Sequence, residues 1–406
     1  MANTMLPEDR YLLDLLAALL HGKPSSPPPP AVSAERLAER AGAHHLDAAL
    51  YLALAPHHPQ GAWWQALTKA YHLELIRETN QETEKAQLFD ALEAEGIRYL
   101  PLKGSVLRDR YPISVIRSMT DLDVLFDVSR AQDVRRVMTE NGYTTIAFHH
   151  YHHDIYHKEP FINVEMHRVL FDELAGGQSY FDRVWERAVP AEDKNGRQLM
   201  TPEDQYIYLL AHMALHFSRG GIGIRSLMDI WVATRRTTPP LNGAYIAREL
   251  DALGLSVFAG RVEALIRAWF EGAEMDEATT ALSAYFLNSG VYGTRQHNEE
   301  KDMAVLAGKD SASPLRYAWN RLFLPLPAMK TIYPVLRRCP FLLPACWMAR
   351  GVRALTVRRK STAAEWERSR QIQTEDVEKS RRLHELSGQP LEGPVFRGYR
   401  LLVSIQ

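Results

Sequence analysis

Residues 121–126 alternate acidic and apolar side chains, in the order Asp-Leu-Asp-Val-Leu-Phe. Because successive side chains of a β-strand point to opposite faces of its sheet, this alternation predicts a strand with Asp121 and Asp123 on one face. Leu122 and Val124 would then point into an apolar core. The α-carbons of the two aspartates would lie about 6.6 Å apart, two rises along the strand. Carboxylates this close repel each other unless a cation lies between them, and hard oxygen ligands favour Mg²⁺ or Mn²⁺.

The segments around this strand alternate between strand and helix, a pattern that predicts a small mixed α/β sheet. Gly104 and Ser105 break the chain after the first strand, and Asn141-Gly142 is typical of a helix C-terminus. The expected elements are, in chain order, a strand over 97–102, a helix over 106–111, the strand over 121–126, a helix over 129–140, and strands over 143–148, 150–157 and 161–167.

In the sequence before and after these sheet segments, the spacing of apolar residues is helical instead. The expected helices cover 7–21, 31–54, 63–95, 203–217, 225–235, 244–253, 257–269 and 362–386. The sequence therefore predicts an α+β protein in which N-terminal helices and a C-terminal helical domain flank a small mixed sheet. The expected divisions are an N-terminal helix with a proline-rich linker (1–30), a helical segment (31–95), the sheet core (96–200), a helical domain (201–310), and a basic, proline-rich arm with a C-terminal helix (311–406).

A third carboxylate, Glu165, lies with His167 on the polar face of the strand over 161–167. If this strand lies beside 121–126, three carboxylates on neighbouring strands would hold two divalent ions about 3.5–4 Å apart. Such a pair of ions suits transfer of a phosphorus group. Asp154 is an alternative to Glu165, because the sequence does not fix the register of the hairpin.

Four residues around the Gly-Ser turn have the chemistry of a phosphate site. Gly104 would let the backbone approach a phosphate closely, and Ser105 would bind its oxygens. Lys103 and Arg117 would neutralise phosphate charge, and the guanidinium of Arg117 offers two-pronged hydrogen bonds. Ion pairing of these two cations with the carboxylates is the alternative.

Together these motifs resemble the nucleotidyltransferase superfamily of the DNA polymerase β type. Its signature joins a Gly-Gly or Gly-Ser turn, an Asp-apolar-Asp strand and a later acidic residue on a strand. More narrowly, the chain resembles a poorly characterised bacterial family of nucleotidyltransferases over roughly residues 31–293. The matching motifs are Leu102-Lys103-Gly104, Arg117, Asp121-Leu122-Asp123 and Glu165-Met166-His167.

The resemblance implies that the sheet core is a nucleotidyltransferase domain, which moves a nucleoside monophosphate from an NTP to an acceptor with two Mg²⁺ or Mn²⁺ ions. The catalytic metal ligands would be Asp121, Asp123 and Glu165. The residues that bind the nucleotide and its phosphates would be Lys103, Gly104, Ser105, Arg117 and His167. Fifteen residues separate Ser105 from Asp121. This spacer is longer than is usual in the superfamily, so the sequence leaves open whether the turn binds the triphosphate.

Two other functions are compatible with the same motifs. One is transfer of another phosphate-activated group, such as a sugar from a nucleotide sugar, and the other is nucleotide binding without catalysis. The acceptor would be a small molecule, a peptide or a protein. The 48 basic and 49 acidic residues balance, which argues against a long nucleic acid as partner.

The histidines carry alternatives of their own. In the run 149–157, strand alternation would put His153 on one face and His152 on the other, and no Cys or Glu completes a tetrahedral zinc site. We therefore expect these histidines to face solvent or substrate. His212 and His216 share one face of a helix and would either line the nucleotide site or pack between helices.

The cysteines and the C-terminal part bear on location and partners. Two cysteines form neither a disulfide framework nor a zinc site, and the first ten residues lack the apolar core of a signal peptide. We therefore expect a cytoplasmic protein. The basic and aromatic region 316–360 would lie on a membrane surface, bind a polyanion, or pack as an arm on the helical domain.

Overall fold

The chain forms two compact units in the computed structural model. The first contains Met1–Asp172, Gly176–Met213 and Gly223–Val291, and the second contains Glu173–Ala175, Ala214–Ile222 and Tyr292–Gln406. The structure describes residues 5–149, 152–160, 162–171, 178–192, 194–218, 221–290, 319, 322–356 and 374–389.

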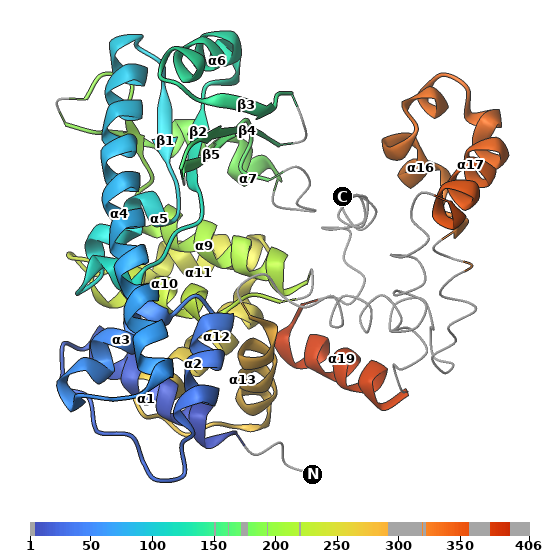
Figure 1. The fold of residues 1–406 in the computed structure, drawn as a ribbon. Coiled ribbons are helices and arrows are strands. Elements are labelled where there is room, and N and C mark those ends of the chain that lie inside the picture. The colour runs from blue at the N-terminus through green and yellow to red at the C-terminus, as the bar shows by residue number, and fades with distance from the viewer. Residues whose placement is uncertain are drawn as a thin grey trace. The chain divides into compact units, whose positions relative to one another are not determined.

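The first unit contains a five-stranded mixed sheet, which lies beside α4 (Ala62–Ala94) and α6 (Ala131–Glu140) in the upper part of Figure 1. Its strands are β1 (Tyr99–Pro101), β2 (Leu122–Phe126), β3 (Thr144–Ala147), β4 (His153–Lys158) and β5 (Ile162–His167). They lie in the order β1-β2-β5-β4-β3, with β2 and β5 parallel and the other neighbours antiparallel. The predicted α+β fold with a small mixed sheet is confirmed.

One face of the sheet is covered by two helices, α4 (Ala62–Ala94) and α6 (Ala131–Glu140). The alternate residues of β2 and β5, among them Val124 and Val164, are fully buried against apolar side chains of these helices. The opposite face therefore carries the polar residues that alternate with them, as the sequence predicts. Figure 1 shows α4 extending from the sheet to the N-terminal helices.

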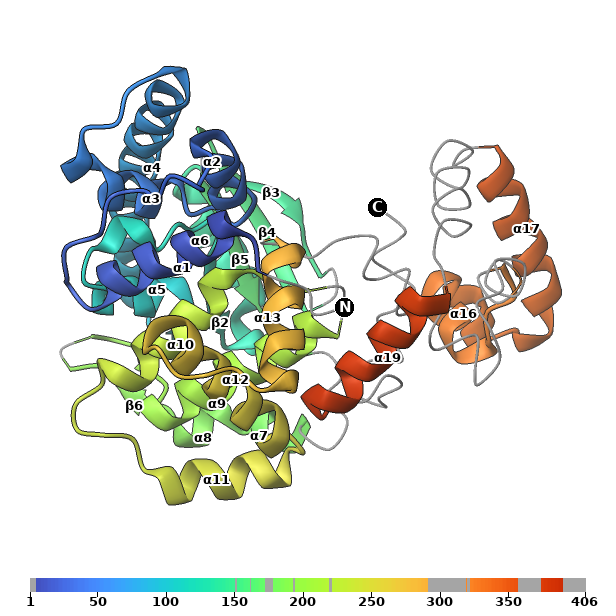
Figure 2. The ribbon, with the colours of Figure 1, turned by 90° about the horizontal axis from the view of Figure 1, so that it is seen from below.

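The N-terminal helices pack against the later helices of the first unit. Contacts join α1 (Pro7–Leu20) to α12 (Ser256–Phe270), and Arg40 of α2 (Ala34–Ala43) donates to the carbonyl of Leu287 at 2.8 Å. Figure 2 shows α12 grouped with α10 and α13. The remaining helices with most of their residues in this unit are α3 (Asp47–Leu54), α5 (Gly104–Leu107), α7 (Gln178–Asp182), α8 (Val184–Arg187), α9 (Pro202–Phe217), α10 (Ile224–Arg235), α11 (Gly243–Ala252) and α13 (Glu277–Ser289). The predicted domain boundaries stay predictions.

Three local expectations differ from the structure. The helix expected over 31–54 is divided into α2 and α3, because His45 between them has a left-handed backbone with φ 52°. The helix expected over 106–111 begins earlier, at Gly104. The strand expected over 150–157 begins at His153, because His152 lies in a turn; residues 150 and 151 are outside the described part.

The second unit has its own small apolar core, formed by Leu324, Met329, Leu336 and Cys346. Its described helices are α16 (Leu326–Ile332), α17 (Leu343–Leu355) and α19 (Thr374–Ser387). The first part of the helix expected over 362–386 lies outside the described residues. Within the described ranges, every helix is too short or too polar to cross a bilayer.

Candidate active site

Two carboxylates lie side by side on the polar face of the sheet. The parallel register of β2 and β5 pairs Asp123 directly with Glu165. A ligand oxygen of each and a ring nitrogen of His167 all lie within 4.8 Å of one another. The sequence predicted this proximity from the alternation in two strands, and the register shows how it arises.

Asp123 is the centre of this group, 4 % exposed and bonded on two sides. Its Oδ1 accepts from Lys103 Nζ at 2.8 Å and from His167 Nε2 at 2.9 Å. Burial by itself would raise the pKa of Asp123, but the Lys103 ammonium and the hydrogen bond from His167 outweigh burial and hold it well below its usual range. Burial lowers the pKa of His167, which favours its neutral form. Because the carboxylate of Asp123 can only accept, Nε2 is the ring nitrogen that carries the hydrogen and donates it.

Glu165 has the opposite electrostatic environment. Burial, together with the negative charges of Asp123 and Asp121, raises the pKa of Glu165 to about 8. A carboxyl group that keeps its proton near neutral pH because of neighbouring carboxylates lacks a balancing positive charge. The two carboxylates therefore fit a divalent cation, which would supply that charge, while His167 Nε2 donates to one of them.

Asp121 lies at the edge of this group. It precedes β2, and its Oδ1 accepts from Thr120 Oγ1 at 3.3 Å. Its oxygens are not among the ligand atoms that cluster within 4.8 Å, although burial and the charge of Asp123 raise its pKa. Its role as a metal ligand stays a prediction.

Asp154 does not replace Glu165 as the third carboxylate. The register of β4 and β5 pairs Asp154 with Met166, which places it on the apolar face of the sheet. There it is fully buried and accepts two hydrogen bonds from Arg168, at 3.0 and 2.7 Å. The hairpin register therefore removes this alternative.

Lys103 reaches Asp123 from a strained backbone conformation. It has φ 47° and ψ −119°, immediately before α5. This region of backbone space is open to glycine, but it costs a residue with a Cβ atom about 1–3 kcal/mol. The strained turn is where the predicted Leu-Lys-Gly motif lies, and it directs the ammonium toward the carboxylates.

Backbone strain at Lys103 predicts an unusual order of stability between two variants. Both Lys103→Gly and Lys103→Ala lose the ammonium, but only glycine relieves the positive φ. We expect Lys103→Gly to be the more stable by about 1 kcal/mol, although glycine is ordinarily the less stable of the two. Urea unfolding of both variants measures this difference, and an Ala variant of equal or greater stability would contradict it.

The Gly-Ser turn is packed by side chains of the chain itself. A Cβ atom on Gly104 would lie 2.6 Å from Arg117 Nη1 and 2.6 Å from Met119 Sδ, so a larger residue would displace these two side chains. Ser105 Oγ donates to the carbonyl of Leu102 at 2.5 Å. These contacts show that Gly104 and Ser105 stabilise the shape of the turn. That they also bind phosphate stays a prediction.

Arg117 forms a buried, two-pronged ion pair with Asp229 of α10. Its Nε donates to Oδ1 at 3.1 Å and its Nη2 to Oδ2 at 2.7 Å. Tyr111 donates to the same carboxylate at 2.6 Å. In this arrangement Arg117 braces the loop before β2, and nothing in the structure tests the phosphate-binding role predicted for it.

Sequence reasoning missed two residues around the site. Arg108 is 1 % exposed and ties the turn to α4, donating to Gln81 Oε1 at 2.8 Å and to Glu82 Oε1 at 3.1 Å. Tyr208 of α9 is buried close enough to the site for the charges of Lys103 and Asp123 to act on its pKa, which burial raises. Neither position has a local sequence signal, because both depend on contacts between distant segments.

The raised pKa of Glu165 predicts how stability depends on pH in the absence of divalent ions. Since the folded state holds this proton more tightly than the unfolded state, unfolding free energy falls as pH rises from about 5 to 8, by at most about 1.4 kcal/mol per pH unit. Glu165→Gln should lack this contribution. Urea unfolding in EDTA across this range compares the two slopes, and equal slopes would contradict the assignment. Added Mg²⁺ should flatten the wild-type slope.

Comparison with known proteins identifies one family. A family model described as "Uncharacterised nucleotidyltransferase" matches residues 30–271, which include the whole sheet and every residue of the site described above. Comparison with curated proteins and with solved structures gives no match. The match confirms the predicted resemblance to this family, and the matched range contains the three motifs on which the resemblance was based. The chain therefore belongs to this family of nucleotidyltransferases.

Proposed function

We propose that this protein transfers a nucleoside monophosphate from an NTP to a nucleophilic group of a small-molecule, peptide or protein acceptor. The observation that carries the proposal is the pairing of Asp123 with Glu165 across β2 and β5, with Lys103 Nζ 2.8 Å from Asp123. Clustered carboxylates beside a fixed ammonium suit a polyphosphate that arrives with divalent cations.

Each residue of the cluster has a separate task in this proposal. Asp123 and Glu165 hold Mg²⁺ or Mn²⁺, and Asp121 completes the ligand set when the NTP is bound. The ion, when bound, would withdraw electron density from the phosphates and stabilise the charge that develops on them. The Lys103 ammonium is balanced by Asp123 and is positioned to offset phosphate charge. His167 keeps the Asp123 carboxylate in one orientation.

The reaction exchanges one phosphorus–oxygen bond for another. The acceptor forms a bond to the α-phosphorus, and the bond between that phosphorus and the oxygen bridging to the β-phosphate breaks. Pyrophosphate leaves, and the proton of the acceptor passes to a base. Glu165 is the candidate for that base where it is not itself a ligand of the ion, because its carboxylate lies beside Asp123 on the neighbouring strand.

The test combines nucleotide binding with product detection. We expect NTP binding by the full chain, measured by calorimetry, to require Mg²⁺ or Mn²⁺. Incubation with α-labelled NTPs and pools of small molecules or peptides should give labelled acceptor and pyrophosphate. Loss of both in Asp121→Ala with Asp123→Ala, and retention in Asp90→Asn at an exposed position of α4, would support the proposal. Unchanged product in the double variant would refute it.

We also propose that residues 322–356 contact an anionic membrane surface. The segment contains Lys330, Arg337, Arg338, Arg350 and Arg353 and no acidic residue. Among its apolar side chains, Phe341 is 77 % and Met348 68 % exposed. Exposed apolar groups on a segment that is rich in basic residues suit an interfacial position on anionic lipid.

Vesicle sedimentation tests this contact. The full chain should sediment with vesicles that contain phosphatidylserine and not with neutral phosphatidylcholine vesicles, and high salt should weaken the binding. Phe341→Ser combined with Met348→Ser should reduce the bound fraction severalfold. Binding to heparin without binding to anionic vesicles would favour a polyanionic partner and contradict the membrane contact.

A further inference from the structure

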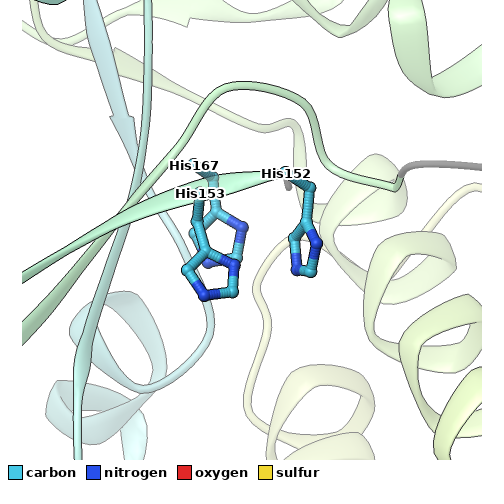
Figure 3. A group of neighbouring side chains, drawn as sticks. All are labelled: His152, His153 and His167. Atoms are coloured by element: carbon cyan, nitrogen blue, oxygen red, sulfur yellow. The ribbon is translucent and has the colours of Figure 1, made fainter. Parts of the chain in front are cut away.

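Three imidazole rings gather where β4 begins and β5 ends. His152 immediately precedes β4, His153 is its first residue, and His167 is the last residue of β5. One ring nitrogen of each lies within 4.8 Å of the others. Figure 3 shows the three side chains close together, with their rings on the same side of the strands.

The turn before β4 brings the first two rings together. In a continuous strand, His152 and His153 would point to opposite faces. Because His152 lies outside the strand, its ring instead approaches that of His153, with ring centroids 4.2 Å apart. The antiparallel register then pairs His153 with His167 across the two strands. The expectation that His152 and His153 lie on different faces is therefore wrong.

Two ring nitrogens of this group are buried and have no hydrogen-bond partner in the part of the chain that the structure describes. His167 uses Nε2 to donate to Asp123, and its Nδ1 has no hydrogen-bond partner among the described residues. The same holds for Nδ1 of His153, whose Nε2 lies 3.8 Å from Glu165 Oε1. A buried nitrogen without a partner costs about 1–3 kcal/mol, so natural structures rarely leave one.

We propose that His152, His153 and His167 form a second cation site, selective for a borderline transition ion of the Zn²⁺ class. Imidazole nitrogen suits such ions, whereas Mg²⁺ requires oxygen ligands. His167 serves both sites, with Nε2 toward Asp123 and Nδ1 toward the ion. A carboxylate on the far nitrogen of a metal-bound imidazole is the usual device that fixes its orientation and tautomer.

Three protein nitrogens leave one tetrahedral position for water or a substrate group. His152 and His153 are only half-buried, so an ion bound to them remains accessible to small ligands. This site rests on the histidines alone and does not depend on nucleotidyl transfer. It explains why the run of histidines adjoins the carboxylates, which the family motifs leave unexplained.

The test measures metal binding by the full chain, without an activity readout. The protein is stripped with a chelator, kept in excess Mg²⁺ to occupy oxygen ligands, and titrated with Zn²⁺ by calorimetry. We expect one equivalent of Zn²⁺ that Mg²⁺ does not displace. Co²⁺ in its place should give the intense visible bands of a four-coordinate site. Absence of this tight equivalent would overturn the proposal.

Histidine variants identify the ligands. His152→Ala and His153→Ala should each weaken Zn²⁺ binding at least about tenfold, or about 1.4 kcal/mol. The matched control is His157→Ala, on the same strand, where Nδ1 bonds Asn163 at 2.9 Å outside the cluster. Thermal melts confirm that each variant is folded. Full affinity in both cluster variants, or an equal loss in His157→Ala, would overturn the assignment. Zinc binding in a protein without transferase activity would refute the proposed function and leave this site standing.

Discussion

Asp123→Asn should lower the rate of Mg²⁺-dependent nucleotide transfer at least about a thousandfold, equivalent to about 4 kcal/mol of transition-state stabilisation. The substitution keeps the shape of the side chain and removes its charge. Asp123 is the residue at which Lys103, His167 and Glu165 converge, so no neighbour can take its place. The amide would also leave the Lys103 ammonium without its counter-charge, which weakens Mg²⁺ binding beside it.

The measurement is the initial rate at saturating NTP and Mg²⁺, together with the dissociation constant of NTP. Asp90→Asn, at an exposed position of α4, is the matched control and should keep the wild-type rate. Far-ultraviolet circular dichroism shows whether each variant is folded. A folded Asp123→Asn protein with a rate within about tenfold of wild type would remove the carboxylate cluster from the mechanism.

Asp229→Ala should lower the free energy of unfolding of the first unit by about 3–5 kcal/mol. The carboxylate accepts two hydrogen bonds from Arg117 and one from Tyr111, and all three side chains are buried. Its removal leaves a guanidinium in the interior with no balancing charge. The free energy lost in this variant is larger than the net contribution of the ion pair, because Arg117 stays desolvated and has no carboxylate to offset that penalty.

An exposed ion pair provides the comparison for this prediction. Arg235 donates to Glu271 at 2.9 Å near the surface, so Glu271→Ala should cost less than about 1 kcal/mol. Arg117→Met combined with Asp229→Leu should recover much of the lost stability, since neither charge is then buried. Urea unfolding, fitted with separate transitions for the two units, measures all three. If Asp229→Ala and Glu271→Ala lowered the free energy of unfolding equally, burial of the ion pair would not increase the cost of removing its carboxylate, and the prediction would be wrong.

Local periodicity predicts the parts of the site that depend on one strand at a time. The alternation in β2 and β5 is enough to place Asp123 and Glu165 on a polar face, because side-chain direction in a strand is set by position alone. The apolar residues between them identify the buried face. Which strands are neighbours, and in which register, is not fixed by this alternation, so the choice between Glu165 and Asp154 depends on the observed pairing of β2, β5 and β4.

Other parts of the site depend on contacts that no local pattern encodes. Arg117 and Asp229 are 112 positions apart, and only the packing of α10 brings them together. The positive φ of Lys103 opposes the preference of a residue with a Cβ atom, and the turn at His152 interrupts the alternation expected of a strand. For this reason the sequence predicts separated histidines where the structure shows a histidine cluster, and it gives no sign of the ion pair between Arg117 and Asp229.

The carboxylate pair forms only when β2 and β5 are paired in the native register. Because side chains alternate between faces, a slip of one residue between these strands would turn Glu165 toward the apolar side chains of α4 and α6. A misregistered chain could not present both carboxylates together. Any ligand that requires both would bind the correct register alone and, by mass action, enrich it among folding chains. The supply of that ligand would then set how much native protein accumulates, as well as how fast the native protein works.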